Sequence, residues 1–242
     1  MATLTEDNLR KYVSQRCINA LEKGKLIKEA AVAKRLISTL DGYEDLQNFG
    51  DLRQIDQASA VVIDIRDWTV RAATLGPYRT YITIECFLPV MAKLVAFFGG
   101  TVVQFTGDGL FALFYRTDIQ TYTRACYCAA YMMLTIHKII NPILSASGIP
   151  SVGELPPLEC GAGLDIGSCF AVKTGSEAFA TITPYGECIN NASHLASGVN
   201  RVKLTDRFYK FVQYMRDANF GKIDDVNWHL NWAKFRFPTP DF

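Results

Sequence analysis

The sequence lacks an excess of charge of either sign, a long uninterrupted apolar run and an apolar leader. Its formal net charge is +1 with 20% charged residues, so it has no electrostatic footprint for nucleic acid or an anionic membrane surface. A helix that crosses a bilayer needs about 20 predominantly apolar residues, and the segment Met1–Lys11 is polar and mixed in charge. We therefore expect a protein that binds neither nucleic acid nor membrane and captures any anionic substrate locally.

The sequence also lacks the cysteine pattern of a disulfide-bonded or zinc-binding protein. Its seven cysteines are odd in number and mostly lie in apolar runs. Cys126 and Cys128 form a C-x-C, but no second pair stands at zinc-site spacing. Because free cysteine is commonly buried, we interpret all seven as reduced core residues, which indicates a cytoplasmic location.

The N-terminal part of the chain carries a helical pattern. Apolar residues recur at helical spacing from about Glu6 to Leu46, with good helix formers between them. We expect residues 1–52 to form a helical arm or hairpin beside a second domain at residues 53–242.

Residues 53–242 alternate between β-branched runs and helical patterns. Ala58–Ile65 is typical of a buried strand, Tyr81–Phe98 of a helix, and Thr101–Phe105 with Leu110–Tyr115 of a hairpin with Asp108 at its tip. This order predicts an α+β, ferredoxin-like unit with an antiparallel sheet and helices on one face. The other expected elements are a helix at Tyr122–Ile140, a loop at Gly148–Pro157, strands at Leu158–Leu164 and Cys169–Lys173, helices at Ile189–Gly198 and Lys203–Ala218, and a strand at Trp228–Phe237.

The predicted arrangement of strands brings two acids together as a candidate metal site. Asp64 ends the first strand and Asp108 lies at the hairpin tip, and these strands are neighbours in a ferredoxin-like unit. Mg²⁺ and Mn²⁺ prefer carboxylate oxygens, and paired metals serve phosphoryl transfer. Taken singly, Asp64 could instead cap a helix and Asp108 shape a D-G turn.

Four segments resemble motifs of the class III adenylate and guanylate cyclases. Ile63–Thr69 (I-D-I-R-D-W-T) resembles D-I-x-G-F-T, and Gly107–Gly109 resembles the G-D hairpin. Gly161–Gly167 (G-A-G-L-D-I-G) is similar to the G-I-G-x-x-x-G strand and turn, and Tyr185–His194 (Y-G-E-C-I-N-N-A-S-H) to W-G-x-x-V-N-x-A-x-R. The four together, in the family's order, are more specific than any one of them. The glycines of the third segment are interpreted as tight-turn residues.

The resemblance implies a class III nucleotide cyclase fold with an N-terminal helical extension, and two divalent metal ions (Mn or Mg) per site. They would be held by Asp64, the backbone carbonyl of Ile65, and Asp108. The ribose 3′-oxygen of a nucleoside triphosphate would attack the α-phosphorus and displace pyrophosphate. The positions that match the family's phosphate-binding helix start, where backbone amides face the phosphates, are Arg66, Asp67, Trp68 and Thr69.

The sequence departs from the family at positions that face the nucleotide. Gln104 replaces the lysine or glutamate that reads the base, and Thr183 occupies the second base-reading position. An amide both donates and accepts, so Gln104 suits a uracil, a cytosine or part of a purine edge. Asn190 matches the ribose-orienting asparagine, whereas His194 replaces the arginine that stabilises phosphate charge. Cations that could substitute for that arginine are Arg66, Arg201, Lys203 and Lys234.

With these departures, the sequence resembles the bacterial pyrimidine cyclases of antiphage defence systems, which make cyclic UMP or cyclic CMP. The resemblance also implies a homodimer with composite active sites, because the family takes its metal-binding acids from one subunit and its base, ribose and arginine positions from the other. A separate effector would then read the product. The alternatives are an adenylate cyclase and a catalytically inactive nucleotide-binding domain.

Overall fold

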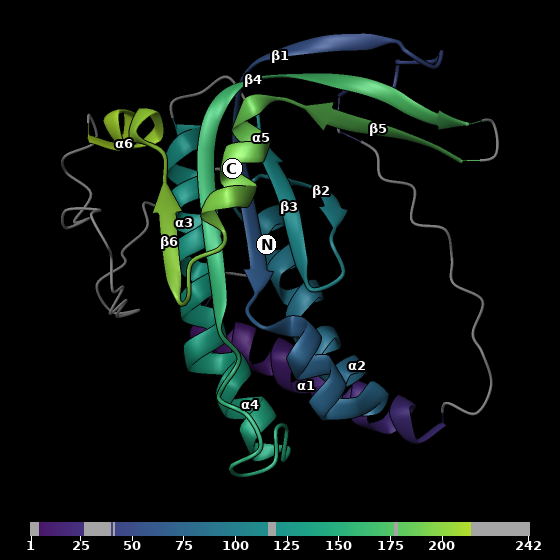
Figure 1. The fold of residues 1–242 in the computed structure, drawn as a ribbon, viewed down its shortest axis with the longest axis vertical. Helices are drawn as coiled ribbons and strands as arrows, with labels where there is room; N and C mark the ends of the chain where they lie inside the picture. Colours follow the sequence, from purple (N-terminus) through teal and green to yellow (C-terminus); the bar gives the residue numbers. More distant parts are fainter. Residues whose placement is uncertain (1–4, 27–39, 41, 116–119, 177–178, 214–242) are drawn as a thin grey trace.

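The computed structural model describes residues 5–26, 40, 42–115, 120–176 and 179–213. These residues form one six-stranded sheet with the strand order β2-β3-β1-β4-β5, and β6 pairs with β4 off this path (Figure 1). The strands are β1 (Leu52–Ile65), β2 (Thr101–Phe105), β3 (Gly109–Phe114), β4 (Cys160–Ser176), β5 (Phe179–Tyr185) and β6 (Arg201–Leu204). The helices are α1 (Glu6–Leu26), α2 (Trp68–Phe97), α3 (Gln120–Thr135), a π-helical turn (Ile136–Ile140), α4 (Asn141–Ala146), α5 (Glu187–Leu195) and α6 (Asp206–Gln213). The expected α+β fold is confirmed.

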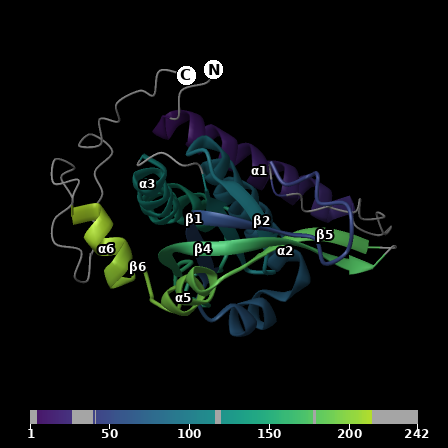
Figure 2. The same cartoon turned by 90° about the horizontal axis from the view of Figure 1, so that it is seen from above.

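Strand β1 lies at the centre because it pairs antiparallel with both β3 and β4. Its alternate side chains face two cores. Val61, Ile63 and Ile65 join a large cluster that includes the inner faces of α2 and α3. Ala60 and Val62 join a smaller cluster with α5 on the other face. Helices therefore cover both faces of the sheet, with α3 and α5 on opposite sides of β4 (Figure 2), rather than one face as expected.

Helix α2 is long and apolar enough to cross a membrane by composition alone. Its most apolar residues are instead part of the large core, where Phe87, Met91 and Leu94 are fully buried. We attribute its apolar character to this packing. Gly76 interrupts the helix with φ 70° and ψ 170°, so a short segment starting at Trp68 precedes the main helix.

Helix α1 confirms the helical pattern at the N-terminus as far as Leu26. Its apolar side chains Leu9, Val13 and Cys17 are buried in the large core, and the Tyr78 hydroxyl of α2 donates a 3.0 Å hydrogen bond to the carbonyl of Leu21. The helix thus packs into the sheet domain. Of the rest of the expected arm, residues 27–39 and 41 lie outside the described residues, whereas residues 42–51 form turns and not the expected helix. The boundary at residue 52 stays a prediction.

Strand β4 differs from the expected pair of strands. It runs unbroken through the segment Gly161–Gly167, so these glycines are not turn residues. A Cβ atom on Gly163 would lie 2.0 Å from the carbonyl oxygen of Ala192, and one on Gly161 would lie 2.0 Å from that of Gly198. The glycines are therefore required because α5 and its following turn rest directly on the strand backbone.

Two further expectations can be compared with the structure, and a third cannot. The segment from Lys203 is the end of β6 followed by α6, and not one helix. All seven cysteines are free in the structure, and all are buried, as their apolar runs predicted. The strand expected at Trp228–Phe237 lies outside the described residues.

Candidate active site

Asp64 and Asp108 lie side by side where β1 meets the β2–β3 hairpin. Asp64 is paired with Gly109 in the β1–β3 register, and the amide of Ile65 donates a 3.2 Å hydrogen bond to the carbonyl of Asp108. Burial of the Asp64 carboxyl, and then the charge of the Asp108 carboxylate, raise the pKa of Asp64 above its ordinary value. Two acids that repel each other in a half-buried place favour the binding of a cation.

Arg66 supplies one such cation. Its guanidinium forms an ion pair with the Asp64 carboxylate, and this charge opposes the rise in the pKa of Asp64. The Nε atom of Arg66 is buried and has no hydrogen-bond acceptor among the described residues. Arg66 therefore partly neutralises the pair of acids.

The donor set at this place fits Mg²⁺ or Mn²⁺. Both side-chain donors are carboxylates, the ligands that these hard cations prefer. Within the described part of the chain, no group of three or more His, Cys, Asp and Glu side chains could hold a metal by itself. Metals at Asp64 and Asp108 would thus need additional oxygen ligands, as sites that share a metal with substrate phosphates do.

The chain turns from β1 into α2 through Asp67. This residue has φ 52° and ψ 33°, the left-handed conformation that favours glycine, and its side chain makes no capping hydrogen bond. The position corresponds to the glycine of D-I-x-G-F-T, and aspartate is among the few other residues that adopt this conformation.

Of the four residues expected to bind phosphate, Trp68 and Thr69 offer backbone amides for it. The amide of Arg66 already donates a 2.8 Å hydrogen bond to the carbonyl of Glu159. Trp68 and Thr69 open α2, where the first amides of a helix have no intrahelical acceptor. No acid stands in the first turn of α2 after Asp67, so the helix start is a suitable place for an anion.

The two residues expected to read the base lie on the first and last strands of the order β2-β3-β1-β4-β5. Gln104 is exposed on β2, paired with Phe111, whereas Thr183 is half-buried on β5, paired with Val172. The Thr183 hydroxyl lies 3.4 Å from that of Thr174. The structure of one chain does not show Gln104 and Thr183 in contact, so their joint action stays a prediction.

Asn190 and His194 are both exposed on α5, one helical turn apart. Of the cations that could replace the family arginine, Arg66 is the one observed at the acid pair. Arg201 and Lys203 lie on β6, and Lys234 is outside the described residues.

Sequence reasoning missed a buried polar cluster around Asp165 on β4. This carboxylate is fully buried and is paired with Arg207 from α6. The available signal was an acid within the apolar run Cys160–Ile166, a place where a charge needs a partner.

Comparison with known proteins gives two related sequences. No family model matches the chain. It is 27% identical over 202 residues to a uridylate cyclase of Xanthomonas perforans, a match that covers 81% of this chain and 77% of that protein. It is 26% identical over 147 residues to adenylate cyclase 1 of Rhizobium meliloti (strain 1021), covering 60% of this chain. That match spans only 21% of the Rhizobium protein.

Solved structures share the fold. The adenylyl cyclase CyaB from P. aeruginosa superimposes with a TM-score of 0.61 over 68% of this chain and 83% of that chain, at 21% sequence identity. The chain therefore has the fold of class III nucleotide cyclase catalytic domains, and its sequence is similar both to a uridylate cyclase and to an adenylate cyclase.

Proposed function

We propose that the protein cyclises a pyrimidine nucleoside triphosphate, UTP or CTP, to a 3′,5′-cyclic nucleotide and pyrophosphate. The observation that carries this proposal is the contact between the ends of β1 and β3, which places Asp64 beside Asp108. A half-buried pair of acids is costly to keep without a cation. Divalent metals bound there would neutralise phosphate charge and lower the pKa of the ribose 3′-hydroxyl.

The start of α2 would hold the triphosphate. The amides of Trp68 and Thr69 and the positive end of the helix dipole suit the β- and γ-phosphates. The exposed Asp67 carboxylate adds a negative charge at this place, so the anion must be held by the backbone and by a nearby cation. Arg66 is such a cation, since release from Asp64 would leave its guanidinium beside the phosphates.

The base preference rests on Gln104 and on the similarity to a uridylate cyclase. An exposed amide on β2 can donate to O4 and accept from N3 of uracil, or accept from N4 of cytosine. Thr183 would add a second hydrogen bond from β5. The antiphage role belongs to this proposal, and it predicts that the cyclic product accumulates in cells during phage infection and is read by a separate effector.

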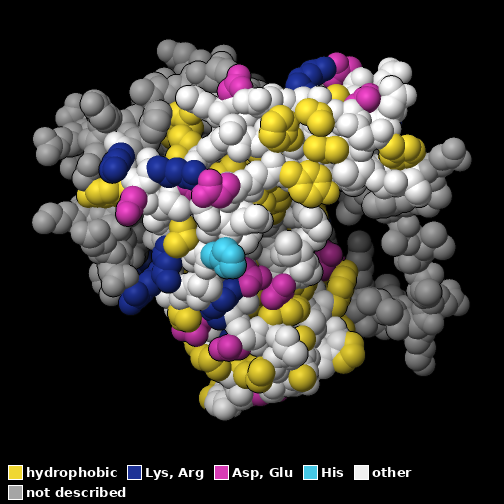
Figure 3. Space-filling view, turned by 45° about the horizontal axis from the view of Figure 1, so that its top comes forward, with side chains coloured by type: hydrophobic (Ala, Val, Ile, Leu, Met, Phe, Trp, Pro, Cys, Tyr) yellow, Lys and Arg dark blue, Asp and Glu magenta, His cyan; other side chains and the backbone are white. Residues whose placement is uncertain are grey.

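The active sites would form between two copies of the chain. Asn190 and His194 would share each active site with the acids of the partner. Asn190 would orient the ribose, and His194 would lie near the phosphate charge. The arm made by β4, β5 and the beginning of β1 exposes hydrophobic side chains that gather on the face seen in Figure 3. Leu52, Phe170 and Tyr185 are 61%, 43% and 53% exposed, and exposed apolar patches mark association surfaces.

The decisive experiment is a product assay. The purified protein is incubated with Mn²⁺ and each of the four ribonucleoside triphosphates, and the cyclic product is identified by mass spectrometry. We expect cyclic UMP or cyclic CMP, and no product from an Asp64→Ala, Asp108→Ala control. Product from neither pyrimidine would overturn the proposal.

A second candidate, adenylate cyclase, is favoured by the similarity to the Rhizobium protein. It uses the same acids and the same helix start, so only the base differs. Cyclic AMP as the sole product would establish it. Nucleotide binding without any product would instead support an inactive domain, for which the histidine at position 194 is the sequence argument.

A further inference from the structure

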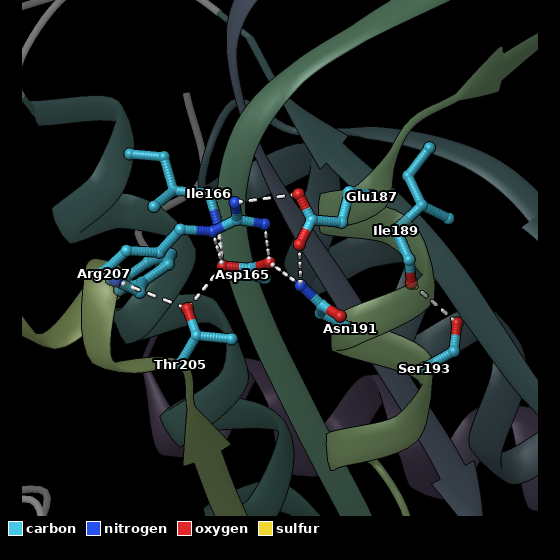
Figure 4. Close-up of polar contacts among 9 residues, drawn as sticks. Asp165, Ile166, Glu187, Ile189, Asn191, Ser193, Thr205 and Arg207 are labelled. Carbon is cyan, nitrogen blue, oxygen red and sulfur yellow. Dashed lines mark hydrogen bonds and ion pairs between the residues drawn. The ribbon is translucent and has the colours of Figure 1, made fainter.

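A buried hydrogen-bond cluster joins the strand β4 to both C-terminal helices of the described chain. The Asp165 carboxylate accepts hydrogen bonds from the Arg207 Nε (2.7 Å), the Asn191 Nδ2 (2.9 Å) and the amide of Ile166 (2.7 Å). The Arg207 Nη2 and the Thr205 hydroxyl also donate to it. Arg207 therefore reaches from α6 to β4, and Asn191 reaches from α5 to the same carboxylate (Figure 4).

The same cluster holds the first turn of α5. Arg207 Nη1 lies 3.3 Å from the carboxylate of Glu187, the first residue of the helix, and Asn191 Nδ2 lies 3.4 Å from the other oxygen of Glu187. Hydrogen bonds to these two positions, one turn apart, fix how the helix is rotated about its axis.

The apolar side chains of α5 interlock little with the sheet, since Ile189 is only partly buried against the smaller core cluster. Its fully buried side chains are Cys188 and Ala192, both small. Beneath them, Gly163 offers backbone only, and Ala192 rests directly on it. A smooth contact of this kind holds the helix close to the strand but provides little that interlocks against rotation.

Asn191 lies directly beside Asn190 and one turn before His194 in the helix. The side chains of Asn190 and His194 are exposed, so the direction in which they point depends on the rotation of α5. We infer that Asp165 and Arg207 are positioning residues, which orient α5 so that Asn190 and His194 reach the acids of the partner subunit. This inference rests on the proposed function and adds residues that touch neither substrate nor metal.

The inference predicts that Arg207 supports only one of the two halves of a composite active site. Arg207→Gln should damage the half that carries Asn190 and leave the half that carries Asp108 intact. On its own, the variant should lose about 10- to 100-fold in kcat, the scale expected for a misplacement of about 1 Å. Mn²⁺ affinity should not change, because Asp64 and Asp108 keep their positions.

Heterodimers with two different affinity tags test this directly. The reference pair, Asp108→Ala with Asn190→Ala, contains one intact site and should show about half of wild-type activity. Arg207→Gln with Asp108→Ala also keeps one intact site and should match the reference. Arg207→Gln with Asn190→Ala damages α5 in both chains and should be about 10- to 100-fold less active.

The outcomes separate the two ideas. If the reference pair is inactive, the shared site is wrong and the positioning role falls with it. If the reference pair is active and the two Arg207→Gln heterodimers are equally active, the positioning role alone is wrong. A general loss of stability would lower the activity of both Arg207→Gln heterodimers to the same extent.

Two further variants guard against misfolding. Arg207→Lys keeps the charge but loses the forked contact, so it should reproduce the same pattern more weakly if Arg207→Gln does not fold. Arg16→Gln breaks an ion pair between α1 and α2 in which the arginine side chain is about as exposed as that of Arg207, 33% against 40%, although its partner Glu85 is less buried than Asp165. It should keep activity, and a loss equal to that of Arg207→Gln would overturn the inference.

Discussion

Asp64 and Arg66 form an ion pair at the end of β1, two residues apart on the chain. Asp64 also stands beside Asp108 and has a raised pKa. The same carboxylate is thus the partner of an internal cation and one of two acids suited to a metal. A metal that binds Asp64 must therefore compete with Arg66.

Removing that competitor should strengthen metal binding. We expect Arg66→Gln to bind Mn²⁺ up to about 5-fold more tightly without nucleotide, the scale of a partly exposed ion pair of up to about 1 kcal/mol. Calorimetric titration of metal-free protein measures this affinity. Arg10→Gln, which breaks the exposed pair with Glu6, is the control. Weaker Mn²⁺ binding by Arg66→Gln would show that Arg66 supports the site rather than competing for it.

Repulsion between the two acids should appear in the pH dependence of stability. The pKa of Asp64 is raised, first by burial and then by Asp108, so the folded protein binds this proton more tightly than the unfolded chain. Stability is then lost as pH rises from the ordinary aspartate pKa of about 3.9 through the raised value.

Asp108→Asn removes part of that repulsion. In EDTA at pH 7 we expect a higher Tm than wild type, where each 1 kcal/mol corresponds to a rise of about 2–4 °C, together with loss of cyclase activity. Melting curves from pH 3.5 to 8 should show a smaller decline in Tm with rising pH for the variant than for wild type. An unchanged or lower Tm at pH 7 would contradict the repulsion between Asp64 and Asp108.

The contact of α5 with β4 predicts unequal effects of two alanine substitutions. Gly163→Ala would place Cβ 2.0 Å from the Ala192 carbonyl oxygen, a backbone atom that cannot move alone. We expect a loss of about 1–3 kcal/mol or more in the free energy of unfolding. Gly167→Ala, whose Cβ would lie 3.3 Å from that of Cys188, is the matched control and should lose clearly less. Equal losses in urea unfolding would contradict the close approach.

The left-handed conformation of Asp67 predicts a preference for glycine. Asp67→Ala should lower the free energy of unfolding by about 1 kcal/mol, because alanine adopts this conformation poorly. Asp67→Gly should stay within about 0.5–1 kcal/mol of wild type, because relief of strain and the entropy of glycine oppose each other. Urea unfolding of the three proteins measures both differences. A more stable alanine than glycine variant would be inconsistent with φ 52°.

Local patterns in the sequence predicted the framework of the candidate site. The β-branched run before Asp64 and the D-G step at Asp108 indicated two neighbouring strands, and the structure places these acids together. The length of β4 was missed because a glycine-rich segment has the same composition in a turn and beneath a close-packed helix.

The sequence by itself determined the strand that ends at Asp64, the hairpin that carries Asp108 and the order of the four motifs, because alternation, turn chemistry and spacing act over a few neighbouring residues. Only the tertiary structure decided that Arg66 faces Asp64, that α5 rests on the bare backbone of Gly163, and that Arg207 reaches Asp165. The last pair is 42 residues apart in the chain, and no local pattern marks the partner of a buried charge. Such pairs form because a carboxylate removed from water must be matched by donors, wherever in the sequence folding brings them.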